Sequence, residues 1–180
     1  AAAEGAAEAG AFPPAAAAPP TGPPAEEAME AGAENFKSRK ERNRDMTIMV
    51  MDGQGGGVGR SLLEALKERF PEAELIAVGT NATATANMMK SGVTSGATGE
   101  NAVVYNSKRA DVIVGPVGIV MADAMLGEIT PTMAAAVASN DAKLILIPMS
   151  KCHATIVGVE SRRLGEYIAE AVDEIAENCF

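Results

Sequence analysis

A glycine-rich run behind an apolar stretch is the part of the sequence whose residue types and spacing best suit chemistry. Residues 46–51 are largely apolar, and five glycines follow within residues 53–59. Glycine lets a ligand approach the backbone, and the start of a helix presents unpaired N–H groups and partial positive charge. The run therefore predicts a strand, a loop that binds a nucleotide phosphate or another anion, and a helix. The candidate binding residues are Gly53, Gln54, Gly55, Gly56, Gly57, Val58 and Gly59.

Asp52 stands directly before this loop, where a carboxylate repels a phosphate unless a cation or a proton intervenes. One interpretation is that its oxygens accept backbone N–H groups of the turn or of the helix start. The other is that it binds Mg²⁺, which favours carboxylate oxygens, or accepts a hydrogen bond from a ligand hydroxyl. The sequence leaves both interpretations open.

The second predicted strand ends in Gly79-Thr80-Asn81, where an NAD-binding site usually has an acidic residue that binds the ribose hydroxyls. Without that carboxylate a 2′-phosphate is not repelled, and Thr80, Asn81 and Thr83 could donate hydrogen bonds to it. This favours NADP over NAD if the ligand is a dinucleotide. The alternative is that Thr80 or Asn81 only caps a helix that runs to Met89.

Three further segments are candidates for the site. The turn formed by Gly115, Pro116, Val117 and Gly118 follows a later apolar run and is expected across the crevice from the first loop. Residues 91–101 are small and polar, and they form either a plain loop or a backbone nest for a second anion. Cys152-His153 follows the last central strand, but neighbours in an extended segment point to opposite faces, which disfavours a nucleophile and base pair.

The spacing Gly-x3-Gly-x-Gly over residues 53–59 is similar to the Thr-Gly-x3-Gly-x-Gly turn of short-chain dehydrogenases, and residues 111–118 look like the fourth strand and following turn of that family. The resemblance implies that the loop binds the pyrophosphate of NAD(P). That family catalyses with a Tyr-x3-Lys pair, and neither Tyr105 nor Tyr167 has a lysine four residues on. No catalytic residue is assigned, and whether the protein is an enzyme stays open.

A second resemblance extends from Met46 to Val159. It is carried by Asp52-Gly53-Gln54-Gly55-Gly56-Gly57, Gly79-Thr80-Asn81, Gly96-Ala97-Thr98-Gly99-Glu100-Asn101 and Leu126-Gly127-Glu128-Ile129-Thr130-Pro131. These strings resemble an uncharacterised bacterial family, domain-of-unknown-function family 3842. The resemblance implies a Rossmann-like fold and carries no activity with it.

Apolar runs alternate along the chain with helical patterns, and this alternation predicts the strands and helices that would position the candidate residues. Strands are predicted at Ile48–Met51, Leu75–Val78, Val103–Tyr105, Val112–Val114 and Leu144–Ile147, with Ile156–Val159 as an added edge strand. Helices are predicted from Val58 to Phe70 before Pro71, after the Thr130-Pro131 cap as far as Ser139, and from Leu164 to about Asn178. This pattern is typical of a three-layer α/β fold with a doubly wound, mainly parallel sheet. It is Rossmann-like, and it is predicted as a single domain over residues 45–180.

Residues 1–44 have a different composition and are predicted to be a disordered Ala- and Pro-rich tail with a basic linker at 37–44. The net charge of −9 opposes a nucleic-acid-binding surface. Two distant cysteines give no disulfide framework and no zinc ligand pairs, which favours the cytoplasm, and no apolar run is long enough to cross a membrane. The expected partner is a small-molecule nucleotide, with homo-oligomerisation open. The alternative is a non-catalytic interaction or scaffold protein that uses the fold without a dinucleotide.

Overall fold

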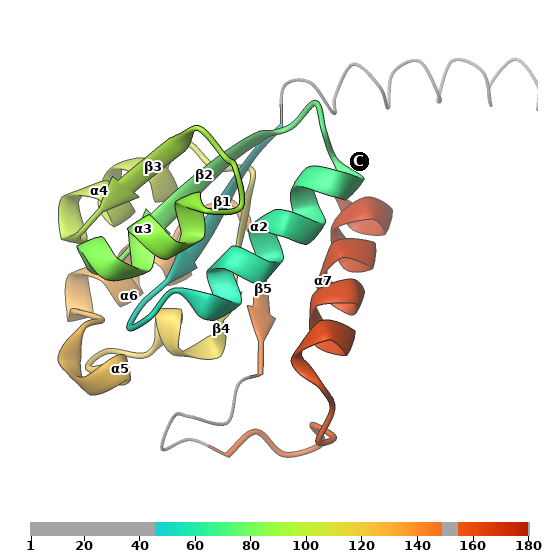
Figure 1. Cartoon of the computed structure of the whole chain (residues 1–180). Helices are drawn as coiled ribbons and strands as arrows, with labels where there is room; N and C mark the ends of the chain where they lie inside the picture. Colours follow the sequence, from blue (N-terminus) through green and yellow to red (C-terminus); the bar gives the residue numbers. More distant parts are fainter. Residues whose placement is uncertain (1–45, 149–154, 180) are drawn as a thin grey trace, which may run out of the picture. The chain divides into compact units, whose positions relative to one another are not determined.

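Every adjacent pair of strands in the central sheet is parallel. The computed structural model describes residues 46–148 and 155–179, so the predicted tail, the basic linker and Cys152-His153 lie outside the described residues. The strands are β1 (Thr47–Asp52), β2 (Glu74–Gly79), β3 (Ser95–Thr98), β4 (Val112–Pro116) and β5 (Lys143–Ile147). Their order in the sheet is β3-β2-β1-β4-β5 (Figure 1). The predicted α/β architecture with a parallel, doubly wound sheet is confirmed.

Helices cover both faces of this sheet. They are α2 (Gly57–Arg69), α3 (Ala82–Met89), α4 (Glu100–Ser107), the 3₁₀ helix η1 (Val117–Val120), α5 (Ala124–Gly127), α6 (Pro131–Ala138) and α7 (Leu164–Asn178). Helix α6 begins as predicted, because the hydroxyl of Thr130 accepts the N–H of Met133 and Pro131 occupies the first helical position. Helices α2 and α7 also have the predicted positions within one or two residues.

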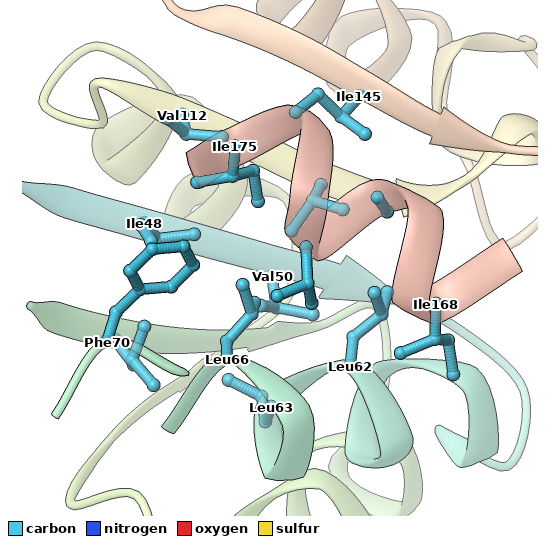
Figure 2. Close-up of a cluster of buried hydrophobic side chains, with 14 of the residues drawn as sticks. Ile48, Val50, Leu62, Leu63, Leu66, Phe70, Val112, Ile145, Ile168 and Ile175 are labelled. Carbon is cyan, nitrogen blue, oxygen red and sulfur yellow. The ribbon is translucent and has the colours of Figure 1, made fainter. Parts of the chain in front are cut away.

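The core has one layer on each side of the sheet, as expected for strands that are buried on both faces. On one face, alternate β1 residues Ile48 and Val50 pack against Leu62 and Leu66 of α2 and Ile168 of α7 (Figure 2). On the other face lie the intervening β1 residues and buried side chains from α4, η1 and α6. This packing on both faces holds β1 in place and so determines where the glycine loop after it begins.

Two predicted strands are wrong. Val103–Tyr105 belongs to α4, where Val103 is buried against the sheet and Tyr105 is exposed. The prediction was wrong because this short apolar run belongs to a helix and not to a strand. Residues 156–159 form an exposed turn. The third strand is instead Ser95–Thr98, which lies within the segment predicted as a loop or nest and pairs with β2 alone. Its residues are small and alternate between half-buried and exposed, so the strand lacks the long apolar run by which the other strands were predicted.

The chain changes direction in the sheet between β3 and β4. It builds outward from β1 through β2 to β3, and then crosses to β4 on the opposite side of β1. The loops that follow β1 and β4 therefore diverge to opposite faces at the carboxyl edge of the sheet, which is where ligands of open α/β sheets bind. The glycine loop lies at this edge. Within the two described stretches, no helix combines the length and the apolar character that a bilayer crossing requires.

Candidate functional site

The glycines of the loop between β1 and α2 divide into two groups. A Cβ at Gly56 would lie 2.4 Å from the carbonyl oxygen of Ala84 in α3, and one at Gly59 would lie 2.8 Å from the Cβ of Asp52. A Cβ at Gly53 would lie 2.6 Å from the Sδ of Met125. Gly56 and Gly59 are required by the packing of the protein itself, whereas the neighbours of Gly53 are the ends of side chains.

Gly55 and Gly57 are different, because a Cβ at either position would meet no atom of residues 46–148 or 155–179 within 4 Å. Both residues are exposed, and Gly57 is the first residue of α2. Among the loop glycines only Gly56 has a positive φ, at 64°. Neither Gly55 nor Gly57 is therefore explained by packing or by backbone conformation, and both face open space.

Most N–H groups of the loop already have acceptors. Those of Gly53 and Gly59 each donate to the carboxylate of Asp52 at 2.8 Å, and that of Gly56 donates to the carbonyl of Gly53. The N–H of Gln54 donates to Glu128 at 2.8 Å. Within the part of the chain that the structure describes, the N–H groups of Gly55 and Gly57 have no such acceptor.

Asp52 is a structural carboxylate of the loop. Its side chain is buried, and its two oxygens accept hydrogen bonds from opposite ends of the turn. Burial raises the pKa of Asp52, and the N–H groups of Gly59, Gly53 and Val58 act in the opposite direction. The first of the two sequence interpretations is thus confirmed. No group of three or more metal-binding side chains lies around it within the described stretches.

Glu128 is the residue that the sequence analysis missed. It comes from the segment between η1 and α6, and a single oxygen, Oε2, accepts three hydrogen bonds. The donors are the N–H of Gln54 at 2.8 Å, the hydroxyl of Thr80 at 2.5 Å and the amide of Asn81 at 2.9 Å. Burial alone raises the pKa of Glu128, but these hydrogen bonds outweigh it and the pKa is lowered.

Two of the three predicted phosphate donors after β2, Thr80 and Asn81, are therefore engaged within the protein. Thr80 donates to Glu128, and Asn81 caps α3 by accepting the N–H of Ala84 at 2.8 Å. The capping role of Asn81 is confirmed. The preference for NADP rested on the absence of a carboxylate beside Thr80 and Asn81, and Glu128 supplies a carboxylate there.

The segment that carries Glu128 has an unusual backbone. Asp123, Met125 and Leu126 have φ values of 62°, 58° and 62°, in the left-handed region that non-glycine residues rarely adopt. Each such residue costs about 1–2 kcal/mol. Leu126 is 97% exposed, while Met125 lies against Gly53 of the loop. This strained segment positions Glu128 at the ends of β1 and β2, where it bonds to Gln54, Thr80 and Asn81.

The second glycine turn, after β4, contributes mainly packing. A Cβ at Gly115 would lie 2.3 Å from the carbonyl oxygen of Met51, so this glycine lets β4 approach β1 closely. Pro116 has no N–H to donate, and Val117 and Gly118 begin η1. The adjacency of this turn to β1 follows from the pairing of β1 with β4.

The fold and the site together define a class: an α/β protein with a doubly wound parallel sheet and a glycine loop at its switch point. Within that class, the model of the family described as "Domain of unknown function (DUF3842)" matches residues 47–179, and the chain belongs to this family. No similar curated protein and no similar solved structure is found.

Proposed function

We propose that the protein binds a nucleotide, with a phosphate group seated on the backbone of Gly55 and Gly57. The observation that carries the proposal is the open space over these two glycines, whose N–H groups lack an acceptor among the described residues. Exposed N–H groups at the start of a helix favour an anion. The 13-residue helix α2 begins at Gly57.

The position of the loop supports the same function. Ligands of open α/β sheets bind outside the carboxyl ends of the strands, at the point where strand order reverses. In this sheet that point lies between β1 and β4, and the glycine loop follows β1 directly. The proposal includes a small-molecule ligand in the cytoplasm and assigns no reaction.

Asp52 favours a second candidate, a non-catalytic scaffold or interaction protein. Its carboxylate takes the N–H groups of Gly53 and Gly59 that a bound phosphate would otherwise use. A loop that satisfies part of its own donors needs no ligand to be stable. The two candidates differ in whether the remaining donors of the loop are used by a ligand.

A thermal-shift screen over NAD, NADP, ATP, FAD, coenzyme A and S-adenosylmethionine separates the candidates. A ligand at about 100 times its dissociation constant stabilises the native state by about 2.7 kcal/mol, a shift of several degrees in a domain of this size. A folded protein whose melting temperature responds to none of these compounds would support the scaffold.

The variant Gly57→Val tests whether the ligand binds at the glycine loop. The added side chain would extend into the space over the loop, so it should abolish the shift while the protein stays folded. Gly165→Val is the matched control, because Gly165 is also in the first turn of a helix, exposed, and without an atom within 4 Å of an added Cβ. If Gly57→Val kept the full response, the ligand would bind elsewhere.

A further inference from the structure

Among the described residues, the two carboxylate oxygens of Glu128 differ in their hydrogen bonds. Oε2 accepts the hydrogen bonds of Gln54, Thr80 and Asn81. Within residues 46–148 and 155–179, Oε1 has no comparable donor. The three bonds fix the carboxylate in place and leave one acceptor available beside the glycine loop.

The residues that donate to Oε2 show where the carboxylate, and so Oε1, lies in the fold. Gln54 belongs to the glycine loop after β1, and Thr80 and Asn81 follow β2. In dinucleotide-binding sheets, an acidic residue at the end of the second strand binds the ribose hydroxyls of the adenosine half. Here that strand ends without an acidic residue, and the carboxylate comes from a segment that follows β4.

We propose that Glu128 accepts the 2′-hydroxyl of the ligand ribose and excludes ligands with a 2′-phosphate. An ionised carboxylate has acceptors only, so it binds a hydroxyl and repels a phosphate. This inference rests on the proposed function, since it assumes that a nucleotide phosphate occupies the loop. It assigns the ligand to nucleotides with an unmodified ribose.

The strained backbone of residues 123–126 is an independent reason to give Glu128 a role. Left-handed conformations of non-glycine residues persist where the surrounding structure enforces them, and they cluster at functional sites. Asp123, Met125 and Leu126 lie within five residues of Glu128. Gln54 of the glycine loop is also left-handed, at φ 49°, and its N–H binds the same carboxylate.

The test is a comparison of NAD and NADP binding to the full-length protein by calorimetry. Wild type should bind NAD at least about tenfold more tightly than NADP, a difference of about 1.4 kcal/mol. Glu128→Gln should bring the two affinities close together, mainly by strengthening NADP. Glu170→Gln is the control, because this glutamate of α7 pairs with Arg162 and lies outside the cluster on Glu128; it should keep the wild-type ratio.

Each outcome decides a separate point. Equal binding of NAD and NADP to wild type would overturn the role of Glu128 and leave the proposed function standing. If neither binds, the same comparison is made between ATP and 2′-deoxy-ATP, where equal affinity would overturn the role of Glu128. The proposed function falls only if no compound of the thermal-shift screen binds. A folded Glu128→Gln protein with the wild-type ratio would show that Glu128 only joins the two loops. If that variant fails to fold, 2′-deoxy-NAD takes its place on wild type, where it should bind at least about tenfold more weakly than NAD; equal affinity would overturn the inference.

Discussion

Asp52 and Glu128 are two carboxylates beside one loop, and their surroundings assign them different roles. Asp52 is buried with both oxygens bonded to the backbone, and burial raises its pKa. Glu128 is half-buried, and donated hydrogen bonds outweigh its burial and lower its pKa. The negative charge of Glu128 also adds to the rise in the pKa of Asp52. The inner carboxylate thus supports the loop, and the outer one remains charged at its surface.

The lowered pKa of Glu128 predicts a pH-dependent contribution to stability. A carboxyl whose pKa is lower in the folded state stabilises the protein above its unfolded pKa, about 4.3 for glutamate, and loses this effect as the pH falls through the folded value. Glu128→Gln keeps an oxygen for the same donors but removes the charge. At neutral pH it should reduce the free energy of unfolding by about 1 kcal/mol or less, because the group is partly exposed.

Thermal melts of both proteins from pH 7 to pH 3 check this prediction. The difference in melting temperature should shrink below about pH 4.3. Asp52 acts with the opposite sign, since its raised pKa favours the folded state at low pH, but burial is the largest cause of that rise and is the same in both proteins. A difference that stays constant or grows toward acid pH would show that the charge of Glu128 does not stabilise the fold.

Only part of this site could be predicted at the level of residues. The glycine loop, the structural role considered for Asp52 and the cap by Asn81 depend on neighbours within a few positions, which the sequence displays directly. Glu128 binds Gln54 across 74 positions of the chain. Such a contact depends on the completed fold. The string Leu126-Gly127-Glu128 could be noticed as a motif in the sequence, but the contact that Glu128 makes could not be inferred from it.

Among the elements, the glycine loop and α3 depend on one another at Gly56. This residue has a positive φ of 64° and faces the backbone of Ala84, so its missing side chain lets the loop pass directly over the helix. The amide of Asn87 in α3 also donates to the carbonyl of Gly55 at 2.8 Å. The position of α3 therefore determines where the open side of the loop faces.

Gly56→Ala should destabilise the protein. The left-handed conformation costs about 1–2 kcal/mol for a residue with a Cβ, and the overlap with Ala84 adds about 1–3 kcal/mol. Gly57→Ala is the matched control and should change the free energy of unfolding by less than about 1 kcal/mol, since its Cβ would meet open space. Urea unfolding of the two variants measures both values. Equal stability of Gly56→Ala and Gly57→Ala would contradict the described contact between the loop and α3.

At the scale of the described domain, the strand order creates the site. Long apolar runs with helical stripes between them made β1, β2, β4 and β5 predictable, because strands buried on both faces have a strong sequence signal. The edge strand β3 has no such signal, since its residues Ser95–Thr98 are small and partly exposed. The reversal at β1 and β4 then places the glycine loop at the switch point of the sheet.

The most direct test of the nucleotide site is a ¹⁵N-labelled amide spectrum recorded during titration with NAD. We expect the N–H signals of Gly55 and Gly57 to move most as NAD is added, because these donors have no acceptor among the described residues. The signal of Gly165, in the first turn of α7, should stay in place. If NAD raises the melting temperature but leaves the signals of Gly55 and Gly57 unchanged, its phosphate is not bound at the glycine loop and the central claim is wrong.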